Sequence, residues 1–149
     1  MTEQKNKLIK NYTTDVPVKK TIEEIHTLLA QNGATGIATE YESGLIKDIF
    51  FKIKYQNREL AFRLPAKPQE VYDALFKGMQ YEDRLKQQRM QKASMIAWRI
   101  CKTWLEAQLT LINLKQAQIQ EVFLPYLVMP NNQTLYEHMK GNQFLLSSG

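Results

Sequence analysis

The sequence predicts an α+β fold in which a three- or four-stranded antiparallel sheet, built as a meander, packs on helices. The spacing of apolar residues changes from about 3.6 to 2 near Gly36, and it alternates through three runs up to Leu64. Residues 84–115 contain neither glycine nor proline, which predicts one long central helix. A chain of 149 residues is near the usual size of one domain, so we expect 1–149 to form a single domain.

The segment before the predicted sheet contains one helix. Residues 1–10 are polar and are expected to be frayed, and residues 12–18 favour a short edge strand. Thr21 is followed three residues later by Glu24, which is the spacing of a capping box. We therefore expect a helix from Thr21 to Asn32.

Two turns divide the predicted meander into three strands, and they fall at residues 43–44 and 56–58. Along the middle strand, the odd-numbered residues of 49–55 are apolar and point to one face. The even-numbered residues of 48–54 carry most of the charge and point to the other face. The first of these faces is expected to pack on the helices, and the second to meet solvent.

Four segments are predicted after the sheet. A short helix opens at Pro68, and the long helix of residues 84–115 supplies most of the core. Residues 121–130 contain two prolines and favour an extended or irregular packing segment. Thr134 and Glu137 form a second capping box, which predicts a last helix. Residues 11–78 thus hold a helix, the meander and a short helix, and residues 79–149 are mainly helical.

Residues that could perform catalysis or bind a metal are isolated from one another. His26, Cys101 and His138 lie in three separate predicted elements, whereas a metal site needs several ligands at helix or loop spacings. Cys101 lies on the apolar side of the long helix, which favours an unreactive core thiol. The chain also lacks a glycine-rich phosphate loop. We therefore expect no metal, no cofactor and no enzymatic activity.

Composition narrows the compartment and the class of partner. A single cysteine and an N-terminal segment without an apolar run indicate a cytoplasmic protein. Residues 122–129 form one of the longest apolar stretches, which is far short of the roughly 20 residues that cross a bilayer. The formal net charge of +5 favours anionic partners.

One run of the long helix carries cations and no acid. It comprises Arg84, Lys86, Arg89, Lys92, Arg99 and Lys102. Lys92, Arg99 and Lys102 gather on one polar stripe of the helix, where they could contact the phosphates of a nucleic acid. The alternative is that these cations only flank a buried helix, with their stems packed and their heads solvated. Glu106 is placed to pair with Lys102 at spacing i, i+4.

A second candidate surface is the outward face of the predicted meander. It combines an aromatic ring with three cations: Phe50, Lys52, Lys54 and Arg63. Such a face can stack bases and hold phosphates. The alternative is an ordinary solvated face on which Asp48 and Glu59 pair with the lysines.

Several short segments together resemble an uncharacterised family of small proteins that phages, prophages and other mobile elements encode. They are KTIEEI (20–25), NGATGI (32–37), FRLP (62–65), AWRI (97–100), WLEAQ (104–108), EVFLPY (121–126) and TLYE (134–137). The resemblance extends from about residue 11 to the last helix. It implies an accessory protein that assists DNA metabolism or blocks host defence, and it brings no catalytic residues with it.

These observations favour a non-enzymatic accessory protein of a phage or mobile element, which binds nucleic acid through basic residues in the cytoplasm of the host cell. The alternative is an inhibitor of a host defence protein or of a protein–nucleic acid complex, and an enzyme of unfamiliar type comes third. The sequence leaves open whether DNA or RNA is bound, and whether the protein forms oligomers.

Overall fold

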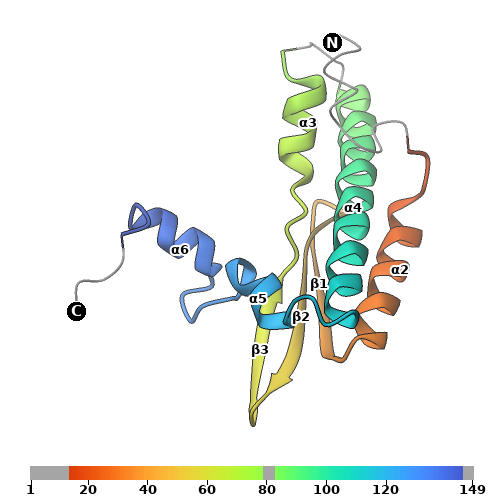
Figure 1. Ribbon diagram of the computed structural model, residues 1–149. Coiled ribbons are helices and arrows are strands. Elements are labelled where there is room, and N and C mark those ends of the chain that lie inside the picture. Colours follow the sequence, from red (N-terminus) through yellow and green to blue (C-terminus); the bar gives the residue numbers. More distant parts are fainter. Residues whose placement is uncertain (1–13, 79–82, 146–149) are drawn as a thin grey trace.

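The computed structural model describes residues 14–78 and 83–145, and these form an α+β fold (Figure 1). The elements, in chain order, are α2 (Val18–Gln31), β1 (Ala34–Glu42), β2 (Leu45–Tyr55), β3 (Arg58–Arg63), α3 (Pro68–Phe76), α4 (Asp83–Asn113), α5 (Ile119–Phe123), the 3₁₀ helix η1 (Leu124–Tyr126) and α6 (Leu135–Gly141). The predicted meander, the short helix and the long helix are confirmed. The expectation for residues 1–10 falls outside the described residues.

The sheet is an antiparallel meander in the order β1-β2-β3. Phe51 pairs with Ile37 on β1 and with Phe62 on β3, so these three side chains share the inward face. The turn between β2 and β3 consists of Gln56 and Asn57, both with positive φ (46° and 63°). Two positive φ angles in a two-residue loop match the right-handed twist of the strands.

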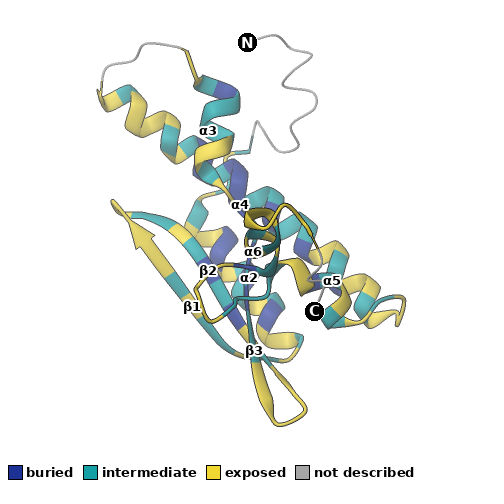
Figure 2. Cartoon of the chain, turned by 90° about the vertical axis from the view of Figure 1, so that its left-hand side faces the viewer, coloured by how far each residue is buried: buried dark blue, intermediate teal, exposed yellow. Residues whose placement is uncertain are grey.

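The core lies between the inward face of the sheet and two helices, α2 and α4 (Figure 2). Three phenylalanine rings meet there: Phe51 lies 5.4 Å from Phe62 and 5.2 Å from Phe123, measured between ring centroids. α4 adds Trp98 and Leu105, both fully buried. Burial of so many large side chains fixes the position of α4 against the sheet.

The first helix differs from the prediction at its start. α2 begins at Val18, with Pro17 as its N-cap, and residues 14–17 form no strand. The predicted edge strand is therefore wrong in its described part, and so is the capping box at Thr21. The extra turn has a physical reason, because Val18 lies one turn ahead of Ile22 and packs against the core.

The proline-containing segment after α4 is more regular than predicted. It forms α5 and η1, and Gln118 and Glu121 make a capping box at the start of α5. Pro125 is tolerated because it stands in the first turn of η1, where its missing N–H has no helical partner to lose. The backbone N–H of Val128 then donates to the carbonyl of Ala61 (2.8 Å), which covers part of the β3 edge.

Two helices extend away from the main core. α3 packs on the first half of α4, beyond the end of the sheet (Figure 1). α6 stands on the other side of the sheet from α2 and α4, close to β3. Its predicted capping box, between Thr134 and Glu137, is confirmed. Among the described helices, none is both long and apolar enough to cross a membrane.

Candidate nucleic-acid interface

The polar stripe of α4 (Lys92, Arg99 and Lys102) faces other protein groups. Arg99 Nη1 lies 2.7 Å from Glu24 Oε2 on α2, and Lys102 Nζ lies 3.3 Å from the same oxygen. Lys102 Nζ also lies 2.9 Å from Glu106 Oε1, so the i, i+4 pair is present. The side chains of Arg99 and Lys102 are only 22% and 17% exposed. Two of the three cations proposed as phosphate contacts are thus occupied internally.

The third cation of the stripe, Lys92, is held by the segment that precedes α2. Its ammonium donates to the carbonyl of Thr14 and lies 3.4 Å from the carboxylate of Asp15. The three stripe cations therefore find acids outside the run itself: Asp15 and Glu24 earlier in the chain, and Glu106 one turn further along α4. This explains how like charges tolerate one another at helical spacings.

The acids and bases of this cluster stabilise each other's charged forms. Burial disfavours the Glu24 carboxylate, but hydrogen bonds from Arg99 and Lys102 outweigh it, so the pKa of Glu24 lies below its ordinary value. The pKa of Lys102 is raised, chiefly by its hydrogen bond to Glu106 and further by Glu24, against the effect of burial. These shifts are the signature of a structural ion-pair network between α2 and α4.

The first cations of the run have a different environment. Arg84 and Lys86 are exposed at the start of α4. The guanidinium of Arg89 lies over the ring of Phe76 on α3, at 5.4 Å from its centroid. Arg89 thus contacts an aromatic ring on α3, whereas Arg84 and Lys86 meet solvent.

The outward face of the sheet is open over β1 and β2, which lie in front of α2 in Figure 2. Phe50 lies between Ala38 on β1 and Arg63 on β3, and Lys52 lies between Gly36 and Ala61. Because its neighbour on β1 is small, the Phe50 ring stays partly exposed. The predicted assignment of Phe50, Lys52 and Lys54 to one face is confirmed.

Charge on this face is divided along the strands. Lys52 and Lys54 are exposed near the β2–β3 hairpin, and no described acid forms a salt bridge with either ammonium. Glu59 lies opposite Lys54 on the neighbouring strand, but their side chains form no salt bridge. Glu40 and Asp48 lie opposite each other at the far end of the face. We call the row of Phe50, Lys52 and Lys54 the sheet track.

The β2–β3 hairpin projects past the ends of the helices, as Figures 1 and 2 both show. Tyr55 is 43% exposed there, and its register partner Arg58 is exposed as well. The alternation pattern placed Tyr55 with the inward apolar residues, and it could not reveal that the helices end before this position. Tyr55 and Arg58 therefore lie near the end of the hairpin, on the opposite face of the strands from the sheet track.

Arg63, the remaining cation predicted for this surface, links the sheet to α6. Its Nη2 lies 2.5 Å from Glu137 Oε1, and its side chain is 23% exposed. The pKa of Glu137 is lowered, first by the backbone N–H of Thr134 and then by Arg63, against the effect of burial. Arg63 therefore positions α6 and has only part of its guanidinium free for a ligand.

A cleft of about 390 Å³ opens beside Arg63, between the sheet, η1, α6 and the segment that joins β3 to α3. We call it the α6 cleft; its polar lining consists of Asp48, Arg63, Lys67, Tyr126, Thr134 and Tyr136. Burial raises the pKa of Asp48, although Arg63 and Lys47 act in the opposite direction. No described donor lies within hydrogen-bond distance of the Asp48 carboxylate. Sequence reasoning missed this cleft, because its lining comes from four separate segments.

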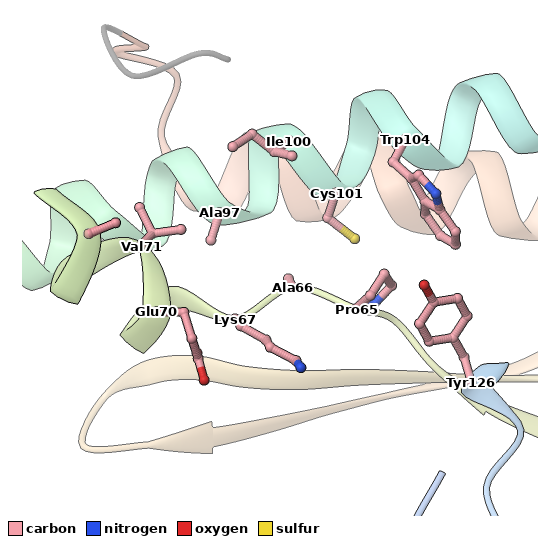
Figure 3. A pocket seen from close by; sticks show the side chains of 11 residues that line it. Pro65, Ala66, Lys67, Glu70, Val71, Ala97, Ile100, Cys101, Trp104 and Tyr126 are labelled. Atoms are coloured by element: carbon pink, nitrogen blue, oxygen red, sulfur yellow. The ribbon is translucent and has the colours of Figure 1, made fainter. Parts of the chain in front are cut away.

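A second cavity, of about 430 Å³, is almost entirely apolar (Figure 3). It lies between α4 and residues 65–67, and the Cys101 sulfur points into it. Cys101 is 4% exposed, and burial raises the pKa of its thiol to about 12. Since the thiolate is the nucleophilic form, this environment suppresses reactivity. The predicted core thiol is confirmed.

The described histidines have single polar neighbours. His26 Nε2 lies 3.4 Å from the hydroxyl of Thr39, and His138 Nε2 lies 3.4 Å from the amide nitrogen of Asn142. Over residues 14–78 and 83–145, no group of three or more histidine, cysteine or acidic residues is placed to hold a metal ion.

Comparisons of the chain with protein-family models, with curated proteins and with solved structures give no match.

Proposed function

We propose that this chain is a non-enzymatic accessory protein of a phage or other mobile element, which binds nucleic acid on the open face of its sheet. The sheet track is the observation that carries the proposal. It presents a partly exposed ring at Phe50 and two exposed cations, Lys52 and Lys54, that no described acid neutralises. An aromatic platform beside a line of cations is the usual means of binding a nucleic-acid strand without reading its sequence.

The spacing of the sheet track supports contact with consecutive nucleotides. Phe50, Lys52 and Lys54 alternate along β2, so their side chains leave the same face at intervals of about 7 Å. Gly36, Ala38 and Ala61 flank them and carry no bulk that would keep a strand away. A base can therefore stack on Phe50 while the phosphates that follow it approach the two ammonium groups.

The stripe of α4 contributes little to this proposal. Lys92, Arg99 and Lys102 each have an acidic partner within 3.4 Å. A phosphate would have to break these contacts, and two of them are largely shielded from water. We therefore assign the stripe to the packing of α2 on α4, and we assign nucleic-acid contact to the sheet track.

A second function, inhibition of a host protein or nucleoprotein complex, is favoured by one surface. Tyr136, Phe144 and Leu145 are exposed at α6 and just after it, and the first two rings lie 5.7 Å apart. Exposed apolar groups of this kind occur at protein interfaces. A complex held by them would survive moderate salt, whereas phosphate contacts weaken steeply.

Substitution of Phe50 tests the proposed function. Stacking contributes about 1–3 kcal/mol per base, so Phe50→Ala should weaken binding of a fluorescent single-stranded oligonucleotide by about five-fold or more. Tyr41→Ala is the matched control, because Tyr41 is an exposed aromatic residue at the acidic end of β1. Equal affinity of Phe50→Ala and the wild type in fluorescence anisotropy would contradict the proposal.

A further inference from the structure

The α6 cleft continues the sheet track, and we infer that it receives an unpaired base of the bound strand, with the Asp48 carboxylate selecting guanine. The inference rests on the proposed function and names the substrate class: single-stranded nucleic acid that carries an accessible guanine.

The cleft and the sheet track are contiguous. Asp48 and Phe50 leave the same face of β2 about 7 Å apart. Arg63 pairs with Phe50 across the sheet and also lines the cleft. A strand that follows Lys54, Lys52 and Phe50 therefore reaches the cleft at the next nucleotide.

The chemistry of the cleft indicates a base that offers hydrogen-bond donors. An ionised carboxylate only accepts hydrogen bonds, and no described donor satisfies that of Asp48. Of the four bases, guanine presents two adjacent donors on one edge, the ring N1–H and the exocyclic amino group. The other bases place an acceptor next to their donor on that edge, which would face the carboxylate with like charge.

The remaining lining suits the rest of a nucleotide. Tyr126 and Tyr136 supply aromatic surface, and Pro65 and Pro125 supply further apolar wall. Lys67 is exposed at the cleft and forms no salt bridge with a described acid, so its ammonium is available to a phosphate. The volume of about 390 Å³ lies in the range of small-ligand sites.

Recognition through this edge requires an unpaired base. In a duplex, the same donors of guanine are occupied by cytosine, so a carboxylate cannot reach them without opening the pair. The inference therefore excludes double-stranded nucleic acid as the preferred ligand.

The test compares an oligomer of twelve thymidines with the same oligomer carrying one central guanine, by fluorescence anisotropy. The wild type should bind the guanine-containing strand about ten-fold more tightly, since correct base contacts discriminate by roughly 1–3 kcal/mol. A central adenine or cytosine should give a smaller gain. Annealing to the complementary strand should abolish the preference.

Two matched variants locate the preference. Asp48→Asn should reduce the ten-fold preference to less than about three-fold while binding of the thymidine strand is kept. Glu59→Gln removes a carboxylate from the same face outside the cleft and should keep the preference. Thermal unfolding checks that both variants are folded. The comparison of strands with a central thymine, guanine, adenine or cytosine uses the wild type alone, so it does not depend on the folding of a variant.

The outcomes distinguish a failure of the inference about the α6 cleft from a failure of the proposed nucleic-acid binding. Equal affinity of the wild type for both strands would overturn the inference about the cleft and leave the proposed function standing. So would a preference that survives Asp48→Asn or disappears in Glu59→Gln. Absence of binding to any of these strands at low salt would overturn the proposed function itself.

Discussion

Glu24 on α2 accepts from Arg99 on α4, with 2.7 Å between Oε2 and Nη1, across the junction of the two helices that cover the sheet. Lys102 approaches the same carboxylate oxygen at 3.3 Å. One acid thus serves two cations that lie about one helical turn apart. This relationship converts a run of like charges on α4 into a contact that holds α2 in place.

Loss of the Glu24 carboxylate should destabilise the protein. Glu24→Gln leaves Arg99 and Lys102 largely shielded from water with weaker partners, so the free energy of unfolding should fall by about 1–3 kcal/mol. Glu23→Gln is the matched control, because its exposed side chain makes no such contact and should change stability by less than about 0.5 kcal/mol. Urea unfolding measures both; equal losses would show that the cluster does not contribute to stability.

The Glu24 contact should also depend on pH. In the folded protein the pKa of the Glu24 carboxyl group is below its ordinary value of 4.5, so the ionised form of Glu24 favours folding. The stabilisation is complete above pH 4.5 and is lost as the pH falls through the folded pKa. The stability difference between Glu23→Gln and Glu24→Gln should therefore narrow as urea unfolding is repeated from pH 6 towards pH 3. A difference that stays constant over this range would refute the ionic origin of the contact.

Cys101 should react slowly in the folded protein. Its thiol is 4% exposed and has a pKa of about 12, so at pH 8 almost no thiolate exists and access is limited. Labelling with iodoacetamide, followed by mass spectrometry, should be much slower in buffer than in concentrated urea. Similar rates in both solvents would mean that the thiol is accessible and that the pocket of Figure 3 opens readily.

Features of the fold that depend on local periodicity were predictable. Alternation along β2 identified which side chains face the core, and the absence of glycine and proline identified α4. The capping box at Thr134 and Glu137 also marks the start of a helix, because α6 begins there. The identical spacing of Thr21 and Glu24 predicts a helix start that is wrong, because α2 begins about one turn earlier. Both side chains instead contact Arg99. Sequence spacing cannot distinguish these two uses.

The candidate site was predictable only in part. The period of two placed Phe50, Lys52 and Lys54 on one face. The helical period that placed the α4 stripe could not show that Asp15 and Glu24, from earlier segments, pair with its cations. The α6 cleft brings Asp48 together with Tyr136, which lies far along the chain. No local pattern encodes such a meeting, because it depends on how α6 is held by the contact between Arg63 and Glu137.

The salt dependence of oligonucleotide binding tests the central claim most directly. In single strands, each neutralised phosphate contributes about 0.7 to the slope of log affinity against log salt, so Lys52→Gln/Lys54→Gln should reduce the slope by about 1.4. Lys19→Gln/Lys20→Gln removes two exposed cations from α2, on the other side of the sheet, and should leave the slope unchanged. An unchanged slope in the Lys52/Lys54 variant, or the same reduction in both variants, would contradict nucleic-acid binding at the sheet track.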